Sequence, residues 1–204
     1  ILFKNNEKFA LIIGSQPSKG ARSPSLWNRA YKKLGKKSKM YPANIKRKKF
    51  AKFIYSLKKN KNFLGCSVTI PHKEKIITYL DSLDSNAKKI GSVNHVVNNS
   101  GKLKGFNTDY YGSLYTIKKT CKKKNNQRIL VLGCGGAGKA CIISVLNFFK
   151  NSEIYLFNRN KKKLKKFTNL KNTKNLIKIV NGYSQLSGLK KINVIINTTS
   201  VGFD

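Results

Sequence analysis

The sequence is poor in carboxylates. Aspartate and glutamate number 7 against 43 lysines and arginines, which gives the 204 residues a formal net charge of +36. Dense lysine is typical of nucleic-acid binding, where it neutralises phosphates, but these basic residues spread over every predicted helix and turn instead of forming one arm. We therefore interpret them as solvated faces and disfavour a nucleic-acid partner. The positive field should still attract small anionic ligands.

Histidine and cysteine are also sparse. His72 and His95 are the two histidines, and the four cysteines contain no C-x-x-C pair: Cys66, Cys121, Cys134 and Cys141. Neither the number nor the spacing of these residues suits a zinc site, so we expect no metal. Unpaired thiols are typical of the cytoplasmic compartment, which we expect for this protein. The apolar runs are far shorter than the ~20 residues that a membrane-spanning helix needs.

A glycine cluster follows the apolar, β-rich run Arg128–Leu132, and an apolar helical pattern begins at Ala140. In this strand–turn–helix order, Gly133, Gly135 and Gly138 fit the pattern G-x-G-x-x-G. The first glycine permits a tight turn, the second lets the backbone approach a pyrophosphate, and the third lets the helix lie close to the strand. Because the open N–H groups of a helix start attract anions, we predict a dinucleotide site. The alternative is a strand-to-helix connection that merely contains glycine.

The segment after the second strand of this unit selects the cofactor. Ile154–Phe157 is followed by Asn-Arg-Asn-Lys-Lys-Lys at 158–163, which contains no carboxylate. An acidic residue at this place binds the 2′-hydroxyl of NAD, whereas an arginine binds the 2′-phosphate of NADP. The bidentate geometry of Arg159 suits a phosphate. We therefore predict NADP, the alternative being that these residues belong to the general lysine excess.

The rest of the chain alternates strands and helices, which predicts an α/β fold with open parallel sheets covered by helices. The expected strands are 9–14, 39–43, 63–70, the hairpin 92–97 and 102–106, then 128–132, 153–157, 176–180 and 192–197. The expected helices are 24–34 with Ser23 as N-cap, 46–61, 72–89, 110–123, 138–150 and 160–170. The basic run 122–126 is interpreted as a domain boundary, because the alternation restarts after it.

Among the carboxylates, Asp109 stands apart. It follows Gly105–Thr108, at the end of a predicted strand and the start of a helix, where open α/β sheets place ligands. Its alternative role is that of an N-cap. Lys73 lies in the comparable position after strand 63–70, although composition alone does not separate it from any surface lysine.

Several short motifs occur together in one order. They are Ser67–Glu74, Gly91–Asn94, Gly105–Asp109, Gly133–Ala137, Asn158–Arg159 and Asn197–Ser200, preceded by Ser23–Pro24 and Leu26–Asn28. As a set they closely resemble the shikimate dehydrogenase family over nearly all of the chain. The resemblance implies two open α/β domains, a substrate-binding and catalytic domain at 1–110 and a Rossmann-like NADP domain at 111–204. It also implies an oxidoreductase that reversibly reduces 3-dehydroshikimate to shikimate with NADPH, in the biosynthesis of chorismate and the aromatic amino acids.

The resemblance also implies roles for residues at matching motif positions. Lys73 would be the general acid/base, and Asp109 would hold and polarise it while bonding a substrate hydroxyl. The other groups that bind the substrate's carboxylate and hydroxyls would be Ser23, Thr69 and Asn94. The cofactor would be bound at the pyrophosphate by Gly133, Cys134, Gly135, Gly136 and Ala137, and at the 2′-phosphate by Asn158, Arg159, Asn160 and Lys163.

The chain departs from the family pattern at three positions. Ala21 stands where the family has the first serine of a Ser-x-Ser pair, Ser67 replaces a usual asparagine, and His95 replaces a usual threonine. A quinate/shikimate dehydrogenase of relaxed substrate or cofactor choice is therefore an alternative, and an inactive basic nucleic-acid-binding remnant is a less favoured one. The family's sheet continues past Asn197, so we expect a cofactor domain that is truncated at its C-terminal end. The sequence leaves monomer and homodimer open.

Overall fold

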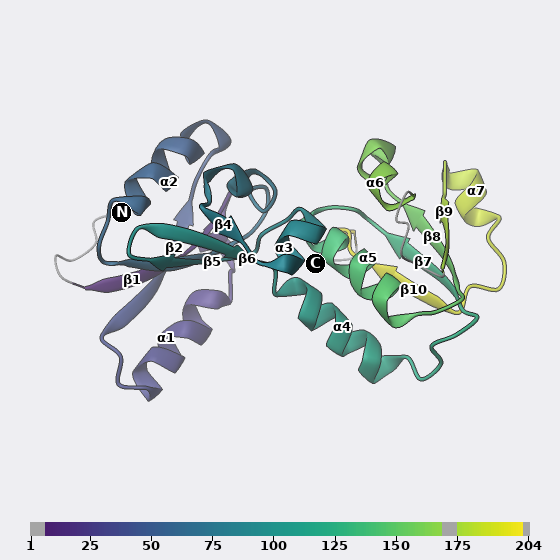
Figure 1. Cartoon of the computed structure of the whole chain (residues 1–204), viewed down its shortest axis with the longest axis horizontal. Helices are drawn as coiled ribbons and strands as arrows, with labels where there is room; N and C mark the ends of the chain where they lie inside the picture. Colours follow the sequence, from purple (N-terminus) through teal and green to yellow (C-terminus); the bar gives the residue numbers. More distant parts are fainter. Residues whose placement is uncertain (1–6, 169–174, 202–204) are drawn as a thin grey trace. The chain divides into compact units, whose positions relative to one another are not determined.

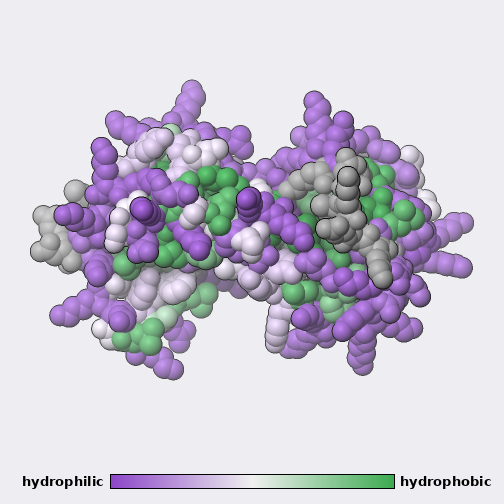
Figure 2. All heavy atoms as spheres, in the orientation of Figure 1, coloured by the Kyte–Doolittle hydropathy of each residue, from purple (hydrophilic) through white to green (hydrophobic). Residues whose placement is uncertain are grey.

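The chain folds into two α/β units, Ile1–Thr108 and Asp109–Asp204, which confirms the predicted fold class. The computed structural model describes residues 7–168 and 175–201 of the chain (Figure 1). No helix among these residues is long and apolar enough to cross a membrane. Figure 2 shows hydrophilic side chains over much of the visible face of each unit, as expected if most lysines are solvated.

The first unit is built on a six-stranded sheet of order β2-β1-β3-β5-β6-β4. Its strands are β1 (Lys8–Gly14), β2 (Ser38–Asn44), β3 (Phe63–Val68), β4 (Ser82–Leu83), β5 (His95–Asn99) and β6 (Lys102–Phe106). Strand β1 is buried along nearly its whole length, as expected for an interior strand covered on both faces. Strand β2 lies at the edge, where Pro42 is tolerated because the strand pairs on one side.

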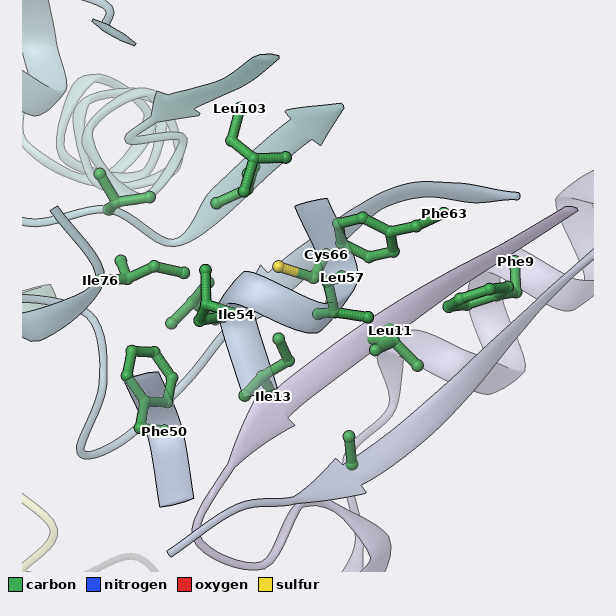
Figure 3. Packing of buried hydrophobic residues seen from close by; sticks show 14 of the residues in the cluster. Phe9, Leu11, Ile13, Phe50, Ile54, Leu57, Phe63, Cys66, Ile76 and Leu103 are labelled. Atoms are coloured by element: carbon green, nitrogen blue, oxygen red, sulfur yellow. The ribbon is translucent and has the colours of Figure 1, made fainter. Parts of the chain in front are cut away.

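Two helices cover opposite faces of this sheet, α1 (Ser23–Lys33) and α2 (Phe50–Lys58) (Figure 1). The alternation of side chains along β1 explains the two layers. One set of β1 residues packs with α2 in the main core, and Figure 3 shows Phe9, Leu11 and Ile13 with Phe50, Ile54 and Leu57. Ala10 and Ile12 of β1 belong to a smaller cluster with Met40, against which Tyr31 of α1 packs.

The predicted hairpin is confirmed, and it makes the first sheet mixed rather than parallel. Strand β5 pairs antiparallel with both β3 and β6, whereas β1, β2 and β3 are parallel. The turn between β5 and β6 consists of Ser100 (φ 50°) and Gly101 (φ 88°), both left-handed. Two such residues form the turn that best matches the twist of antiparallel strands.

The predicted helix 72–89 is wrong. The segment forms a 3₁₀ helix (Lys75–Tyr79), strand β4 and the short helix α3 (Ser85–Ile90). Two acidic side chains bond to backbone groups here. The Asp81 carboxylate accepts from the N–H of Leu103 at 2.7 Å, and that of Asp84 accepts from Ala87 at 2.8 Å, which caps α3. Short acidic side chains favour such caps and turns over helix interiors.

Other predicted boundaries also shift. Ser23 is not the N-cap of α1 but its first residue, because Arg22 occupies the N-cap position without a side-chain bond. A 3₁₀ turn (Arg47–Lys49) precedes α2, so the predicted helix 46–61 is shorter than expected. Strand β3 ends at Val68, before the cis peptide bond between Ile70 and Pro71.

The second unit has a parallel sheet of order β10-β7-β8-β9, as predicted. Its strands are β7 (Arg128–Leu132), β8 (Glu153–Phe157), β9 (Leu176–Ile179) and β10 (Val194–Asn197). Its helices are α4 (Asp109–Thr120), α5 (Gly136–Phe148), α6 (Lys165–Thr168) and α7 (Tyr183–Ser187). Helix α5 is buried almost all round, and its Ser144 hydroxyl donates to the carbonyl of Tyr110 in α4 at 2.9 Å.

In this unit one helix was not predicted and another predicted helix forms only in part. The sequence did not predict α7. The predicted helix 160–170 is a 3₁₀ turn (Lys161–Lys163) followed by the single turn of α6, and residues 169 and 170 lie outside the described residues.

Candidate functional site

The glycines of the turn between β7 and α5 differ in the space around them: two are packed against other atoms, and one is open to a ligand. Gly133 has φ +98°, and a Cβ there would lie 2.6 Å from Thr198 Oγ1; at Gly138 it would lie 2.7 Å from the same oxygen. Both positions therefore require glycine for the fold. At Gly135, by contrast, an added Cβ meets no atom within 4 Å. The fold alone does not require this glycine, and the open space above it fits a ligand that approaches the backbone.

Hydrogen bonds fasten the turn to the end of β8. The N–H of Gly133 donates to the Phe157 carbonyl at 2.8 Å, and the N–H of Cys134 donates to Asn158 Oδ1 at 3.0 Å. The buried Cys134 thiol lies 3.4 Å from the Lys163 carbonyl. The predicted pyrophosphate turn and the basic segment 158–163 therefore form one hydrogen-bonded assembly.

Two asparagine side chains order the basic segment itself. Asn158 Nδ2 donates to the Asn160 carbonyl at 2.7 Å, and Asn160 Oδ1 accepts from the N–H of Lys162 at 3.1 Å. Both side chains hold backbone, so they shape the segment that carries the exposed guanidinium of Arg159.

A cavity of about 440 Å³ opens beside this assembly, a size that suits a small-molecule ligand. Its lining residues are Leu132–Gly135, Phe157–Arg159, Tyr183, Leu186 and Asn197–Val201. None of these lining residues is acidic. The first turn of α5 begins at the same place, and the N–H groups of a first helical turn have no partner within the helix and favour an anion.

The cavity gathers some of the predicted cofactor residues but not all. It includes Gly133, Cys134, Gly135, Asn158 and Arg159. The remaining predicted residues, Gly136, Ala137, Asn160 and Lys163, are not among its lining residues. Ala137 instead lines a second cavity of about 570 Å³, between α4, α5 and β10.

In the first unit, hydrogen bonds join two of the motifs. Asn94 Nδ2 donates to Thr108 Oγ1 at 2.9 Å, and Asn94 Oδ1 accepts from the N–H of Thr108 at 2.8 Å. The buried Asn107 donates to the Ser92 carbonyl at 2.8 Å. The segments 91–94 and 105–108 therefore lie side by side, with the amide of Asn94 held in a fixed orientation.

Lys73 belongs to the same assembly. Its carbonyl accepts from the N–H of Val93 at 2.8 Å, next to Asn94. The preceding residue, His72, is fully buried, stacks on Phe50 at a ring distance of 4.1 Å, and lies with Nε2 2.7 Å from the Ile45 carbonyl. Sequence reasoning did not single out His72, which anchors the segment that carries Lys73.

Thr69 lies at a cavity of about 320 Å³ together with Ser15, Gln16, Ala21 and Arg22 of the loop after β1. Ser23, the first residue of α1, is not among the residues that line this cavity. Asp109 is half-buried and opens α4, where an acidic residue also stabilises the helix start.

The two family departures in the sheet are register partners. Ser67 of β3 pairs with His95 of β5, and both line a cavity of about 120 Å³ with Trp27. The ring of His95 stacks on Trp27 at 6.5 Å. Burial lowers the pKa of His95, so the neutral ring is favoured.

Two features of the cavity of about 440 Å³ were not predicted from the sequence. Thr198 receives no role from the glycine pattern, although its hydroxyl lies where side chains at Gly133 and Gly138 would be. The motif Asn197–Ser200 was a signal for it. Helix α7, with Tyr183 and Leu186, had no such signal because five residues are too few to establish a helical period.

Comparisons with known proteins point to one family. The sequence profile described as the shikimate dehydrogenase substrate binding domain matches residues 12–96. A protein of Halothermothrix orenii named shikimate dehydrogenase (NADP(+)) is 38% identical, and the match covers 98% of this chain and 71% of that protein.

Solved structures agree with the sequence comparison. The crystal structure of shikimate dehydrogenase from Aquifex aeolicus matches with a TM-score of 0.83 and 31% identity, over 100% of this chain and 73% of that chain. The structure of shikimate 5-dehydrogenase from Listeria monocytogenes in complex with shikimate and NAD matches with a TM-score of 0.78 and 26% identity, over the same shares of the two chains.

Proposed function

The chain belongs to the shikimate dehydrogenase family, and we propose that it is an NADP-dependent oxidoreductase that interconverts shikimate and 3-dehydroshikimate. The observation that carries the proposal is the structure of the glycine turn. The turn leaves open space above Gly135, and it is hydrogen-bonded to a basic segment that contains no carboxylate. That arrangement fits a dinucleotide with a phosphorylated ribose. Shikimate, the product of the reduction, serves the biosynthesis of chorismate and the aromatic amino acids.

The residues present fit NADP. The backbone from Gly133 to Ala137 would hold the pyrophosphate at the start of α5. Arg159 would bind the 2′-phosphate, and Lys163 would add positive charge. The side chains of Asn158 and Asn160 order the segment that carries both residues. When bound, the cofactor supplies the hydride acceptor for shikimate oxidation.

The proton of the reaction is assigned to Lys73. As the reacting hydroxyl becomes a carbonyl, the neutral amine of Lys73 accepts the hydroxyl proton, and in the reverse direction its ammonium group returns that proton. By the family resemblance, Asp109 would be the residue that holds Lys73 and bonds a substrate hydroxyl. Lys73 suits this role because its backbone is tied to Val93 and its neighbour His72 is anchored in the core.

The remaining substrate contacts are proposed for Ser23, Thr69 and Asn94. Hydroxyl and amide groups bond the substrate's carboxylate and hydroxyls, and the net positive charge of the chain attracts the carboxylate. The side chain of Asn94 suits this role because its hydrogen bonds to Thr108 fix the orientation of its amide group. A cytoplasmic location and a monomeric or homodimeric state are parts of this proposal, the location because all four cysteines are free thiols.

A specific observation favours one second candidate. Ser67 and His95 are cross-strand partners at a cavity of about 120 Å³, and both depart from the family pattern. If the ring of the substrate meets this cavity, serine in place of the usual asparagine would leave space there for a further ring substituent. A quinate/shikimate dehydrogenase of relaxed substrate choice is therefore the alternative.

One assay tests the proposal. NADPH formation is followed by absorbance with the full-length protein, using shikimate or quinate and NADP⁺ or NAD⁺ in all four combinations. We expect shikimate with NADP⁺ to give the highest kcat/KM. Faster turnover of quinate would support the alternative, and no reduction of either cofactor would exclude both dehydrogenase activities.

A further inference from the structure

Tyr183 is an exposed aromatic residue at the cofactor cavity. It is the first residue of α7, its side chain is 70% exposed, and it lines the cavity of about 440 Å³. Its ring centroid lies 5.4 Å from that of Phe157, with the planes tilted by 55°. The ring is thus supported by a neighbour but remains open to solvent.

The position of Tyr183 is held by local bonds. The N–H of Asn181 donates to Gln185 Oε1 at 2.6 Å, which ties the chain before α7 to the helix. The N–H of Leu186 donates to the Gly182 carbonyl at 3.0 Å. Leu186 lies three residues after Tyr183, so the two side chains share a helix face, and both line the cavity.

The place of helix α7 in the chain order indicates which half of the cofactor Tyr183 meets. Strand β8 is the second strand of this unit and β9 is the third in chain order, and α7 follows β9. In a dinucleotide fold the adenosine half binds near the end of the second strand. Phe157 and Arg159, at the end of β8, line the same cavity as Tyr183.

The chemistry of this end of the cavity suits a flat aromatic base. Phe157, Tyr183 and Leu186 give it an apolar wall, and Arg159 gives it a positive charge. Purine bases stack on tyrosine rings, and a tyrosine loses little conformational freedom when it does so because it has only two side-chain torsions. An exposed aromatic side chain of this kind contributes little to the core of its own unit.

We propose that Tyr183 is the aromatic platform on which the adenine ring of the cofactor stacks. The assignment rests on the proposed function, since it concerns the same NADP site. It adds a residue outside the glycine turn and the basic segment. It also predicts that affinity for the adenosine half depends on α7.

The test uses calorimetric titration of the full-length protein. Tyr183→Ala should raise the Kd for adenosine 2′,5′-bisphosphate and for NADP⁺ about tenfold, whereas Tyr183→Phe should change either Kd less than about twofold, because stacking needs the ring and not the hydroxyl. Nicotinamide mononucleotide should bind all variants equally. The matched control is Tyr115→Ala, because Tyr115 is 68% exposed on α4 and does not line this cavity.

The possible outcomes separate the two proposals. If the unsubstituted protein binds the bisphosphate and Tyr183→Ala binds it equally well, the adenine assignment is wrong while the proposed function stands. A loss confined to nicotinamide mononucleotide would also overturn it, because Tyr183 would then face the other half of the cofactor. If the unsubstituted protein binds none of the probes, both proposals fail. Unfolding temperatures of the variants show that the loss is not one of folding.

Discussion

At the scale of single residues, Lys73 lies on a segment that backbone and core contacts hold in place. Its carbonyl is bonded to Val93, and the segment before it is anchored by a buried histidine. Lys75 lies two residues further on, is exposed, and belongs to the adjoining 3₁₀ helix. The two lysines therefore provide a matched pair within one segment.

We expect Lys73→Ala to lower kcat for shikimate oxidation by about 10²- to 10⁴-fold, the usual contribution of a general acid or base. Lys75→Ala should leave kcat close to that of the unsubstituted protein. Steady-state kinetics with shikimate and NADP⁺ measure both. A Lys73→Ala variant that retains near-normal kcat would remove the assignment of this residue.

At the scale of elements, the turn between β7 and α5 combines two requirements in adjacent positions. Gly133 meets a need of the fold, because its φ is +98° and Thr198 leaves no space for a Cβ. Gly135 meets no such need, because the space above it is open. The same residue type thus serves packing at one position and, in our proposal, ligand access at the other.

Alanine substitutions should separate these requirements. Gly133→Ala should lower the free energy of unfolding by about 1–3 kcal/mol, the cost of a strained backbone conformation. Gly135→Ala should leave unfolding unchanged and raise the Kd for NADP⁺ about tenfold or more, because its methyl group occupies the space proposed for the pyrophosphate. Denaturant unfolding and cofactor titration measure the two effects. Equal destabilisation by both variants would contradict the distinction.

At the scale of the whole molecule, ionisable groups limit stability in acid. Burial is the main cause that lowers the pKa of His72, and the positive charges of Arg47 and Lys75 add to it, while the bond to the Ile45 carbonyl opposes it. Burial also lowers the pKa of His95. Hydrogen bonds from Tyr155 and Lys178 lower the pKa of Glu153 to about 2.

The directions of these pKa shifts determine the pH range in which the folded state loses stability. The folded state favours neutral histidines, so their contribution is complete above the unfolded pKa of about 6.5 and is lost as the pH falls below it. The contribution of Glu153 persists to about pH 4.5 and is lost only as the pH falls toward 2. Between pH 6.5 and 4.5 the histidines therefore dominate the pH dependence of stability.

Over this range we expect the free energy of unfolding to fall with pH by up to about 1.4 kcal/mol per unit for each histidine. Replacing His72 by Phe keeps an aromatic ring against Phe50. It should reduce the pH dependence of the free energy of unfolding by up to about 1.4 kcal/mol per pH unit, whatever the absolute stability of the variant. Denaturant unfolding at several pH values and constant ionic strength measures the slope. An unchanged slope in the variant would show that His72 does not titrate between the folded and unfolded states.

The fold could be predicted from the sequence wherever local pattern and final environment agree. Apolar runs such as 128–132 and 153–157 become strands in the structure, and the hairpin around Ser100–Gly101 forms because its turn residues accept left-handed conformations. The local pattern of segment 72–89 predicts one helix, but the segment forms a 3₁₀ helix, strand β4 and helix α3. Its conformation depends on Asp81 bonding to Leu103, a residue far along the chain that a local pattern does not include.

The sequence by itself determined the α/β class, the glycine turn and the choice of NADP over NAD, because each depends on residue types at short spacings along the chain. Only the tertiary structure decided which glycines the fold requires, that Asn158 bonds the basic segment to the glycine turn, and that α7 brings Tyr183 to the cavity beside that turn. These features depend on contacts between separate elements, which form only when the strands and helices have packed.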